Sequence, residues 1–312
     1  MKEVLPYILA LALLPVAASC SFEDEPGVCP YNVRLEYWYA GYATENRLPV
    51  RMDNLQEYLY DGGGRLVRTC DLRRDSLTGY HCTLVPGEYT VVVWGNLDTG
   101  GNGATCVSSA DPLPAAALTA LRDTVPPGWR ENPGRLYYGS AAFTVPASGV
   151  MSRRIYVSHA HASLTVTVSW NTDRPRLDGP LTMRLRGIPG CYGFSAGREI
   201  PSLNAAGPHQ VPAMDLHETR HAVRATADYA GDVSGEFVTF RYTNATHQWW
   251  SLWCGGRQVI RELDLSRFFA RSSVDMDHNV EQEFHLLVLV DADHIVVTEI
   301  SGTDWEEGGV IG

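Results

Sequence analysis

A period-two alternation of apolar and polar residues is the feature that most constrains the fold of this chain. The alternation is clearest over residues 32–40, where Val33, Leu35, Tyr37 and Tyr39 alternate with polar residues and one tryptophan. Successive side chains of an extended strand point to opposite faces of a sheet. The pattern therefore predicts a strand with one buried face.

Short apolar segments bounded by turn residues continue along the chain. Residues 55–61 and 65–68 flank three glycines, Gly62–Gly64, and predict a hairpin. The apolar, β-branched run Tyr89–Trp94 is typical of a central strand of a sandwich. Further strands are expected at 136–145, 155–170 (two short strands or one long bent one), 181–190 (followed by a Gly-rich turn over 191–197), 221–229, 237–242, 249–254, 258–265, 283–291 and 294–300.

One segment of the first half favours a helix instead. Residues 114–123, PAAALTALRD, are the best helix candidate there. Elsewhere the short spacing of strands and turn signals indicates β-sandwiches rather than βαβ units. The fold class predicted from the residues is therefore all-β.

The N-terminus indicates export. An apolar run from Leu5 to Ala18 suits the h-region of a secretory signal and is too short for a transmembrane helix. The small residues Ala18 and Ser19 lead directly into Cys20, as in a bacterial lipobox, where the cysteine thiol receives a diacylglycerol and becomes the new N-terminus. An ordinary secretory signal with a structural Cys20 is the alternative. Lipidation at Cys20 would tie a globular body to a membrane by one end.

Length and charge set further bounds. The chain has 312 residues and a formal net charge of −11, which argues against nucleic acid as a main partner. This length favours two domains, and the stretch VPASGV suggests a boundary near residues 150–158. The expected division is a signal peptide (1–19), a lipidated acidic tether (20–30), an N-terminal β-sandwich (31–155) and a C-terminal β-sandwich (156–312).

The cysteine count leaves the redox pattern open. Six cysteines remain beside Cys20, which allows up to three disulfides in an exported protein. Cys70 and Cys82 flank a polar, turn-like stretch and could staple a hairpin. No spacing indicates a zinc cage, and free thiols are the alternative. The six are Cys29, Cys70, Cys82, Cys106, Cys191 and Cys254.

Residues 217–221, HETRH, match a zinc-peptidase motif. On a helix, His217 and His221 would bind zinc, and Glu218 would act as the general base. The following residues alternate as in a strand, and Arg224 stands where the extended motif needs glycine. We therefore interpret HETRH as a chance match and expect neither catalytic activity nor a cofactor.

Two further clusters carry weaker signals. His159 and His161 share one face of a strand and could begin a metal site, but no third ligand is evident, so ordinary histidines are favoured. Trp249, Trp250 and Trp253 could stack on sugars, although alternation places at least one of them in the core. A surface glycan-binding lipoprotein is thus the alternative function. Loss of polysaccharide binding in Trp250→Ala or Trp253→Ala would support this alternative function.

Several segments occur in a fixed order that resembles a known family. They are the lipobox, YNVRLEYWY, LYDGGGRLV, LVPGEYTVVVWGN, LYYG and a late strand leading into TDWEEG. This order is similar to that of the FimB-type minor fimbrial subunits of Bacteroidetes, the anchors of type V pili. The acidic residues 23–25 resemble the surface-export signal of lipoproteins in the same group.

The resemblance implies both a fold and a role. The implied fold is two tandem transthyretin-like, Greek-key β-sandwich domains. The implied role is a lipid-anchored outer-membrane protein, exposed on the cell surface, that holds the base of a fimbria in cell adhesion. Its partners would be major or accessory fimbrial subunits, joined by β-strand addition. Cys20 is the one residue to which the resemblance assigns a function.

Overall fold

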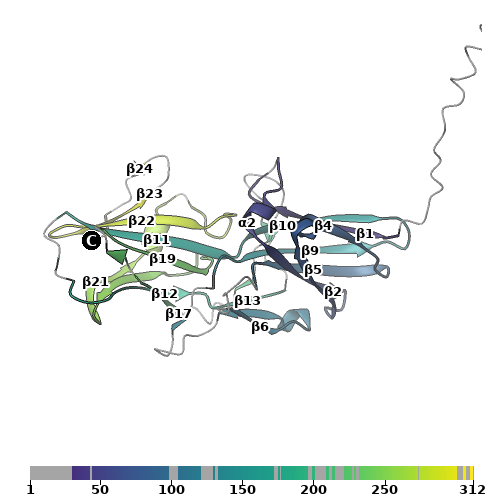
Figure 1. Ribbon diagram of the computed structural model, residues 1–312, viewed down its shortest axis with the longest axis horizontal. Coiled ribbons are helices and arrows are strands. Elements are labelled where there is room, and N and C mark those ends of the chain that lie inside the picture. The colour runs from purple at the N-terminus through teal and green to yellow at the C-terminus, as the bar shows by residue number, and fades with distance from the viewer. Residues whose placement is uncertain are drawn as a thin grey trace, which may run out of the picture.

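The protein is described by a computed structural model in which strands dominate (Figure 1). The all-β prediction is confirmed. No helix within the described part of the chain is long and apolar enough to cross a membrane. The structure describes residues 30–311 except 43, 98–104, 121–128, 131–132, 172–174, 176, 196–198, 201–208, 211–212, 215–220, 227, 230–231, 273, 301–304 and 307–309.

The first half of the chain forms a sheet that curls on itself. The strands at the two edges of this sheet, β3 and β4, approach each other, and Arg68 of β3 donates a hydrogen bond to the Tyr80 hydroxyl of β4. The 3₁₀ turn η1 (Arg74–Thr78) joins these two strands. The strand order is β3 (Leu66–Arg73), β2 (Asn54–Asp61), β5 (Gly87–Gly95), β9 (Tyr137–Val145), β10 (Met151–His159), β1 (Val33–Tyr39) and β4 (Gly79–Cys82).

Strand β5 is buried on both faces, as its uninterrupted apolar sequence predicts. Val91 and Val93 face the interior of the curled sheet, together with the alternating residues of β1. Val92 and Trp94 point outward into a second core. The strand predicted at 32–40 and the hairpin around Gly62–Gly64 are likewise confirmed.

A small sheet covers the outer face of the curled sheet. Its order is β16 (Ala213–Met214), β13 (Cys191–Gly193), β7 (Ala117–Ala120) and β6 (Thr105–Ser109). The helix predicted at 114–123 is wrong, because a short 3₁₀ turn, η2 (Leu113–Ala115), leads into strand β7. Leu118 and Ala120 of β7 are buried on one face, so packing with period two overrides the helix propensity of the alanines.

The second half of the chain is a sandwich of two sheets around one core, in which Val166, Leu185 and Trp250 are fully buried. Strands β11 and β22 pair in parallel at its centre. One sheet has the order β18 (Asp228–Tyr229), β19 (Val233–Phe240), β11 (His161–Trp170), β22 (Glu283–Val290), β23 (Ile295–Ile300) and β24 (Trp305–Glu306), and β25 (Val310–Ile311) also pairs with β23. The other sheet has the order β21 (Arg257–Asp264), β20 (Trp249–Cys254), β12 (Leu181–Ile188), β17 (His221–Thr226) and β8 (Trp129–Arg130).

The two halves exchange short strands. β8 of the first half pairs with β17 of the second, and β13 of the second half pairs with β7 of the first. The chain itself crosses at Ala160, because β10 ends at His159 and β11 begins at His161. The remaining elements are short: α2 (Leu48–Arg51), α3 (Ser266–Phe269) and the ladder of β14 (Glu199–Ile200) with β15 (His209–Gln210).

The cysteines form no disulfide in the part of the chain that is described. Cys70 and Cys82 are free thiols, so the expected hairpin staple is absent. Strand β3 pairs with β2 and β4 pairs with β1, so the two cysteines do not face each other across one hairpin. Cys106, Cys191 and Cys254 are also free. Cys29 lies outside the described residues.

Candidate functional site

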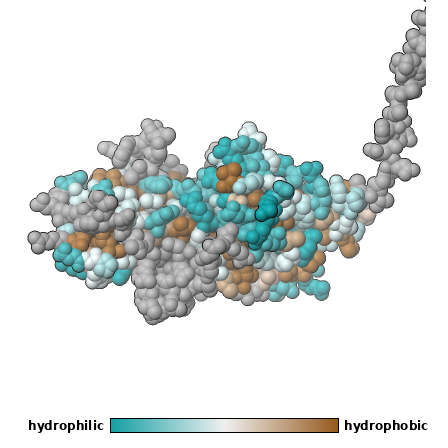
Figure 2. All heavy atoms as spheres, viewed as in Figure 1, coloured by the Kyte–Doolittle hydropathy of each residue, from teal (hydrophilic) through white to brown (hydrophobic). Residues whose placement is uncertain are grey.

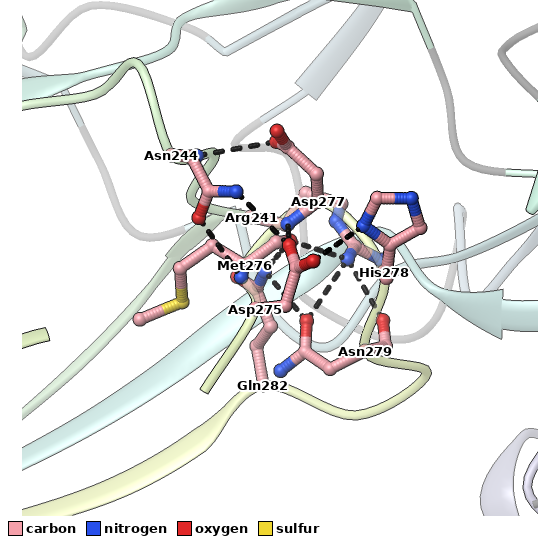
Figure 3. A network of polar contacts seen from close by, with 8 residues as sticks. All are labelled: Arg241, Asn244, Asp275, Met276, Asp277, His278, Asn279 and Gln282. Atoms are coloured by element: carbon pink, nitrogen blue, oxygen red, sulfur yellow. Dashed lines mark hydrogen bonds and ion pairs between the residues drawn. The ribbon is translucent and has the colours of Figure 1, made fainter. Parts of the chain in front are cut away.

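The junction between the two halves is built around a fully buried arginine, Arg241, which follows β19 (Figure 3). Its guanidinium donates hydrogen bonds to the carbonyl oxygens of His159 (2.8 Å), Met276 (3.1 Å) and Asn279 (2.9 Å). Burial lowers the pKa of Arg241 to about 10. These bonds tie the crossing point of the chain to the loop that precedes β22.

That loop is held by side chains as well. Gln282 Nε2 donates to the Met276 carbonyl at 2.9 Å, and Asn244 Nδ2 donates to the Asp275 carboxylate at 2.9 Å. His278 Nδ1 lies 2.7 Å from the same carboxylate, as Figure 3 shows. Asn244 and His278 hold the pKa of Asp275 below its ordinary value, although burial opposes this. The loop is therefore a fixed part of the junction.

Beside Arg241, the structure brings His159 and His161 together with a third side chain. The two imidazoles stack with centroids 4.3 Å apart, although their residues belong to strands of different sheets. Glu283, the first residue of β22, completes the group, and the ligand atoms of all three residues lie within 4.8 Å of one another. Sequence reasoning missed Glu283 because it lies more than 120 residues away; the parallel register of β22 with β11 brings it here.

Burial determines the charge of this histidine pair. Both imidazoles are fully buried. The pKa of His161 is lowered to about 4, mainly by burial; a hydrogen bond to the Leu136 carbonyl opposes this, and neighbouring arginines add to it. Burial, then the nearby His161, lower the pKa of His159 well below its ordinary value. Both rings are therefore neutral at physiological pH.

A second buried polar cluster lies inside the curled sheet. Glu57 is fully buried on β2, and both of its carboxylate oxygens accept hydrogen bonds. The Tyr80 hydroxyl donates at 2.6 and 2.9 Å, Arg68 donates at 3.2 Å, and Tyr37 also donates. Burial, then the charge of Glu57, raise the pKa of both tyrosines. This satisfied cluster is structural.

The tryptophans proposed to stack on sugars are largely packed. Trp250 is fully buried in the core, as alternation predicts for one of the pair. Trp253 is half-buried, and the Arg184 guanidinium lies 3.6 Å from the centroid of its ring. One face of that ring is thus already occupied by a cation.

A groove with a mixed polar and apolar lining opens at the end of the second sandwich that is remote from β1. It has a volume of about 930 Å³ and is flanked by the edge strand β21. Figure 2 shows hydrophobic residues gathered at this left end of the molecule, where Figure 1 places β21. The half-buried apolar residues of the groove are Trp170, Leu177, Val259, Val290 and Ile295.

Comparison with known proteins identifies the family. The family model for fimbrillin-A associated anchor proteins Mfa1 and Mfa2 matches residues 25–206, more than half of the chain. The chain belongs to this anchor family. No curated protein matches it.

Solved structures share the fold of this anchor-family member. The fimbrial anchor protein Mfa2 from Porphyromonas gingivalis superposes with a TM-score of 0.63 at 13% identity, covering 90% of this chain and 100% of that one. A candidate polysaccharide-binding protein from Bacteroides thetaiotaomicron superposes with a TM-score of 0.63 at 12% identity, covering 86% of this chain and 98% of that one. A candidate adhesin from Bacteroides ovatus superposes with a TM-score of 0.63 at 12% identity, covering 90% of this chain and 94% of that one. At these identities the likeness shows the fold alone.

Two of the predicted sites fall outside the described residues. They are Cys20, the expected lipidation site, and positions 217–220 of HETRH. His221 is the first residue of strand β17, so the last position of the motif is extended rather than helical. A zinc peptidase of this motif needs both histidines on one helix face, which this strand does not provide.

Proposed function

We propose that this anchor-family protein is a surface-exposed outer-membrane lipoprotein that holds a fimbria through its folded body. The observation that carries the proposal is the match to the anchor family over residues 25–206. In this proposal residues 1–19 are a signal peptide, Cys20 carries the lipid, and residues 20–30 form a tether. Residues 31–155 and 156–312 are the two sandwich domains. The role requires no catalysis and no cofactor.

The arrangement of the molecule supports an anchor. The fold is elongated, with β1 towards one end and β21 at the other (Figure 1). Lipid at Cys20 would hold the end near β1 close to the membrane, since few residues separate Cys20 from Val33. The groove beside β21 would then face away from the membrane, where the next subunit must attach.

The groove also suits the addition of a strand. A donor strand needs an unpaired sheet edge for its main-chain hydrogen bonds and apolar pockets for alternate side chains. β21 ends its sheet in the described part of the chain, and Val259 and Ile260 of β21 line the groove. We place an extended segment of a fimbrial subunit in this groove as its occupant.

The anchor role is tested in the native host with Cys20→Ala. We expect fimbriae to assemble but to be shed into the medium, as measured by immunogold labelling and cell fractionation. Cys106→Ala, which removes an exposed free thiol, is the control and should retain them. Fimbriae that stay attached with unchanged length would refute the anchor role and favour a separate glycan-binding lipoprotein.

Strand addition is tested separately with Val259→Asp. A carboxylate at this half-buried position should block an incoming strand, because an apolar side chain of that strand would have to pack against a charge. We expect the variant to remain in the membrane fraction while fimbriae detach from the cells. The control is Val67→Asp on β3, where the valine is already 50% exposed. Retained fimbriae in Val259→Asp would place the contact elsewhere.

A further inference from the structure

We propose that His159, His161 and Glu283 bind a divalent transition-metal ion, zinc by their chemistry, at the junction of the two halves. Their ligand atoms lie within 4.8 Å of one another. Neighbouring ligands of a tetrahedral zinc ion lie about 3.4 Å apart, as bonds of 2.0–2.2 Å require. Binding therefore draws the three side chains together by about 1 Å or slightly more.

Three imidazole nitrogens of this site lack hydrogen-bond partners among the described residues. Both nitrogens of His159 and Nε2 of His161 are buried and lack a hydrogen-bond partner among the described residues. A buried polar atom without a partner costs about 1–3 kcal/mol, so native proteins rarely leave one unexplained. Three such atoms within two adjacent rings indicate a site that a ligand completes.

The orientation of His161 suits a metal ligand. Its Nδ1 lies 2.7 Å from the Leu136 carbonyl oxygen. The carbonyl can only accept, so Nδ1 carries the proton and Nε2 keeps its lone pair for a metal. A backbone carbonyl commonly fixes the tautomer of metal-bound histidines in this way.

Glu283 supplies the charged ligand and is itself held in place. Ser163 of β11 pairs with Glu283 of β22, which fixes the start of that strand beside the histidines. Arg135 Nη1 lies 3.0 Å from Glu283 Oε1 and orients the carboxylate. Two nitrogens and one carboxylate oxygen favour zinc over calcium or magnesium, which prefer oxygen ligands.

Carboxylates offset two of the three arginine charges near the histidine pair, so one positive charge still opposes a dication. Arg51, Arg135 and Arg241 act on the histidine pair and oppose a cation. Glu281, which pairs with Arg51 at 2.9 Å, and Glu283 offset two of these charges.

A metal here would fasten the connection between the two halves. His159 ends β10, His161 begins β11, and Glu283 begins β22. The ion would thus join the curled sheet to two central strands of the second sandwich at the point where the chain crosses.

The test measures metal binding to the purified chain from residue 21 onward, first stripped with chelator. Titration with zinc chloride, followed by elemental analysis after gel filtration, should give one zinc per chain. Cobalt(II) should give the intense visible bands of a four-coordinate site. Glu283→Gln, which changes an exposed side chain and spares the core, should weaken binding at least tenfold. His159→Leu should abolish it.

Two controls locate the ion. His285→Ala removes an exposed histidine from the same strand as Glu283 and should leave binding unchanged. His217→Ala tests the HETRH motif. Absence of stoichiometric zinc would overturn the proposal and leave water as the partner of the imidazoles. Zinc that is lost in His217→Ala but retained in Glu283→Gln would also overturn it. Neither outcome bears on the anchor role.

Discussion

Two polar clusters of this protein have fully buried centres, Glu57 in one and the pair His159 and His161 in the other, but differ in how these centres are satisfied. Inside the curled sheet, the two oxygens of Glu57 accept hydrogen bonds from two tyrosines and Arg68. At the junction, the nitrogens of His159 find no partner in the described structure. The Glu57 carboxylate is satisfied without a ligand, although Arg68 Nε beside it has no partner among the described residues, whereas three imidazole nitrogens at the junction have none.

The difference shows that burial of a titratable group is not by itself a sign of function. A buried charge is tolerated when its neighbours supply hydrogen bonds, as at Glu57. Arg241 follows the same rule with carbonyl oxygens in place of a carboxylate. An unsatisfied buried group instead calls for an external partner, which is why the histidine pair is the better candidate site.

The largest expected effect is that of Glu57→Ala. Removing the carboxylate leaves Arg68 and two tyrosine hydroxyls facing a buried gap, so the free energy of unfolding should fall by about 3–5 kcal/mol. Urea denaturation of the folded body measures it. Glu88→Ala, at the exposed start of the adjacent strand β5, should change stability by less than about 0.5 kcal/mol. Equal effects of the two variants would contradict a structural role for Glu57.

Arg241→Met should have the next largest effect. Methionine fills a similar space but removes the guanidinium donors to the carbonyls of His159, Met276 and Asn279, of which Met276 keeps its bond from Gln282. We expect a loss of about 3 kcal/mol, because hydrogen bonds to a charged group are lost while a buried charge is relieved. Amide hydrogen exchange should accelerate over residues 275–282. Exposed Arg257→Met is the control. Unchanged amide hydrogen exchange in Arg241→Met would contradict the role of Arg241 in holding this loop.

Tyr37→Phe probes one bond of the satisfied cluster. The hydroxyl of Tyr37 donates to Glu57, and both residues are fully buried. Loss of this single charge-assisted hydrogen bond should lower the free energy of unfolding by about 2 kcal/mol. Thermal and urea unfolding should agree on the sign. A neutral result would mean that Tyr80 and Arg68 alone satisfy the carboxylate.

His159→Leu should have the smallest effect and the opposite sign. In the metal-free protein this change removes unpaired nitrogens and keeps an apolar side chain of similar volume. We expect unfolding to become less favourable by about 1 kcal/mol when chelator is present. With zinc present, the wild type should instead be the more stable protein. Destabilisation of the variant in chelator would show that the imidazole already has a partner.

The strands were predictable because their signal is local. Alternation over residues 32–40 and the apolar run Tyr89–Trp94 gave β1 and β5 from the residues alone. The helix predicted at 114–123 is wrong because packing of Leu118 into the core sets the local backbone conformation, and the helix propensity of its sequence neighbours does not. Propensity is a weak prior wherever a tertiary contact competes with it.

The sequence by itself determined the all-β class, the positions of most strands along the chain, the apolar start of the chain and the resemblance to fimbrial anchors. These features depend on side-chain periodicity and short motifs, which neighbouring residues encode. Only the tertiary structure decided that Cys70 and Cys82 stay free and that β13 completes a sheet of the first half. It also brought Glu283 to the histidine pair. Such contacts depend on strand register and packing between residues far apart in sequence, and no local pattern records them.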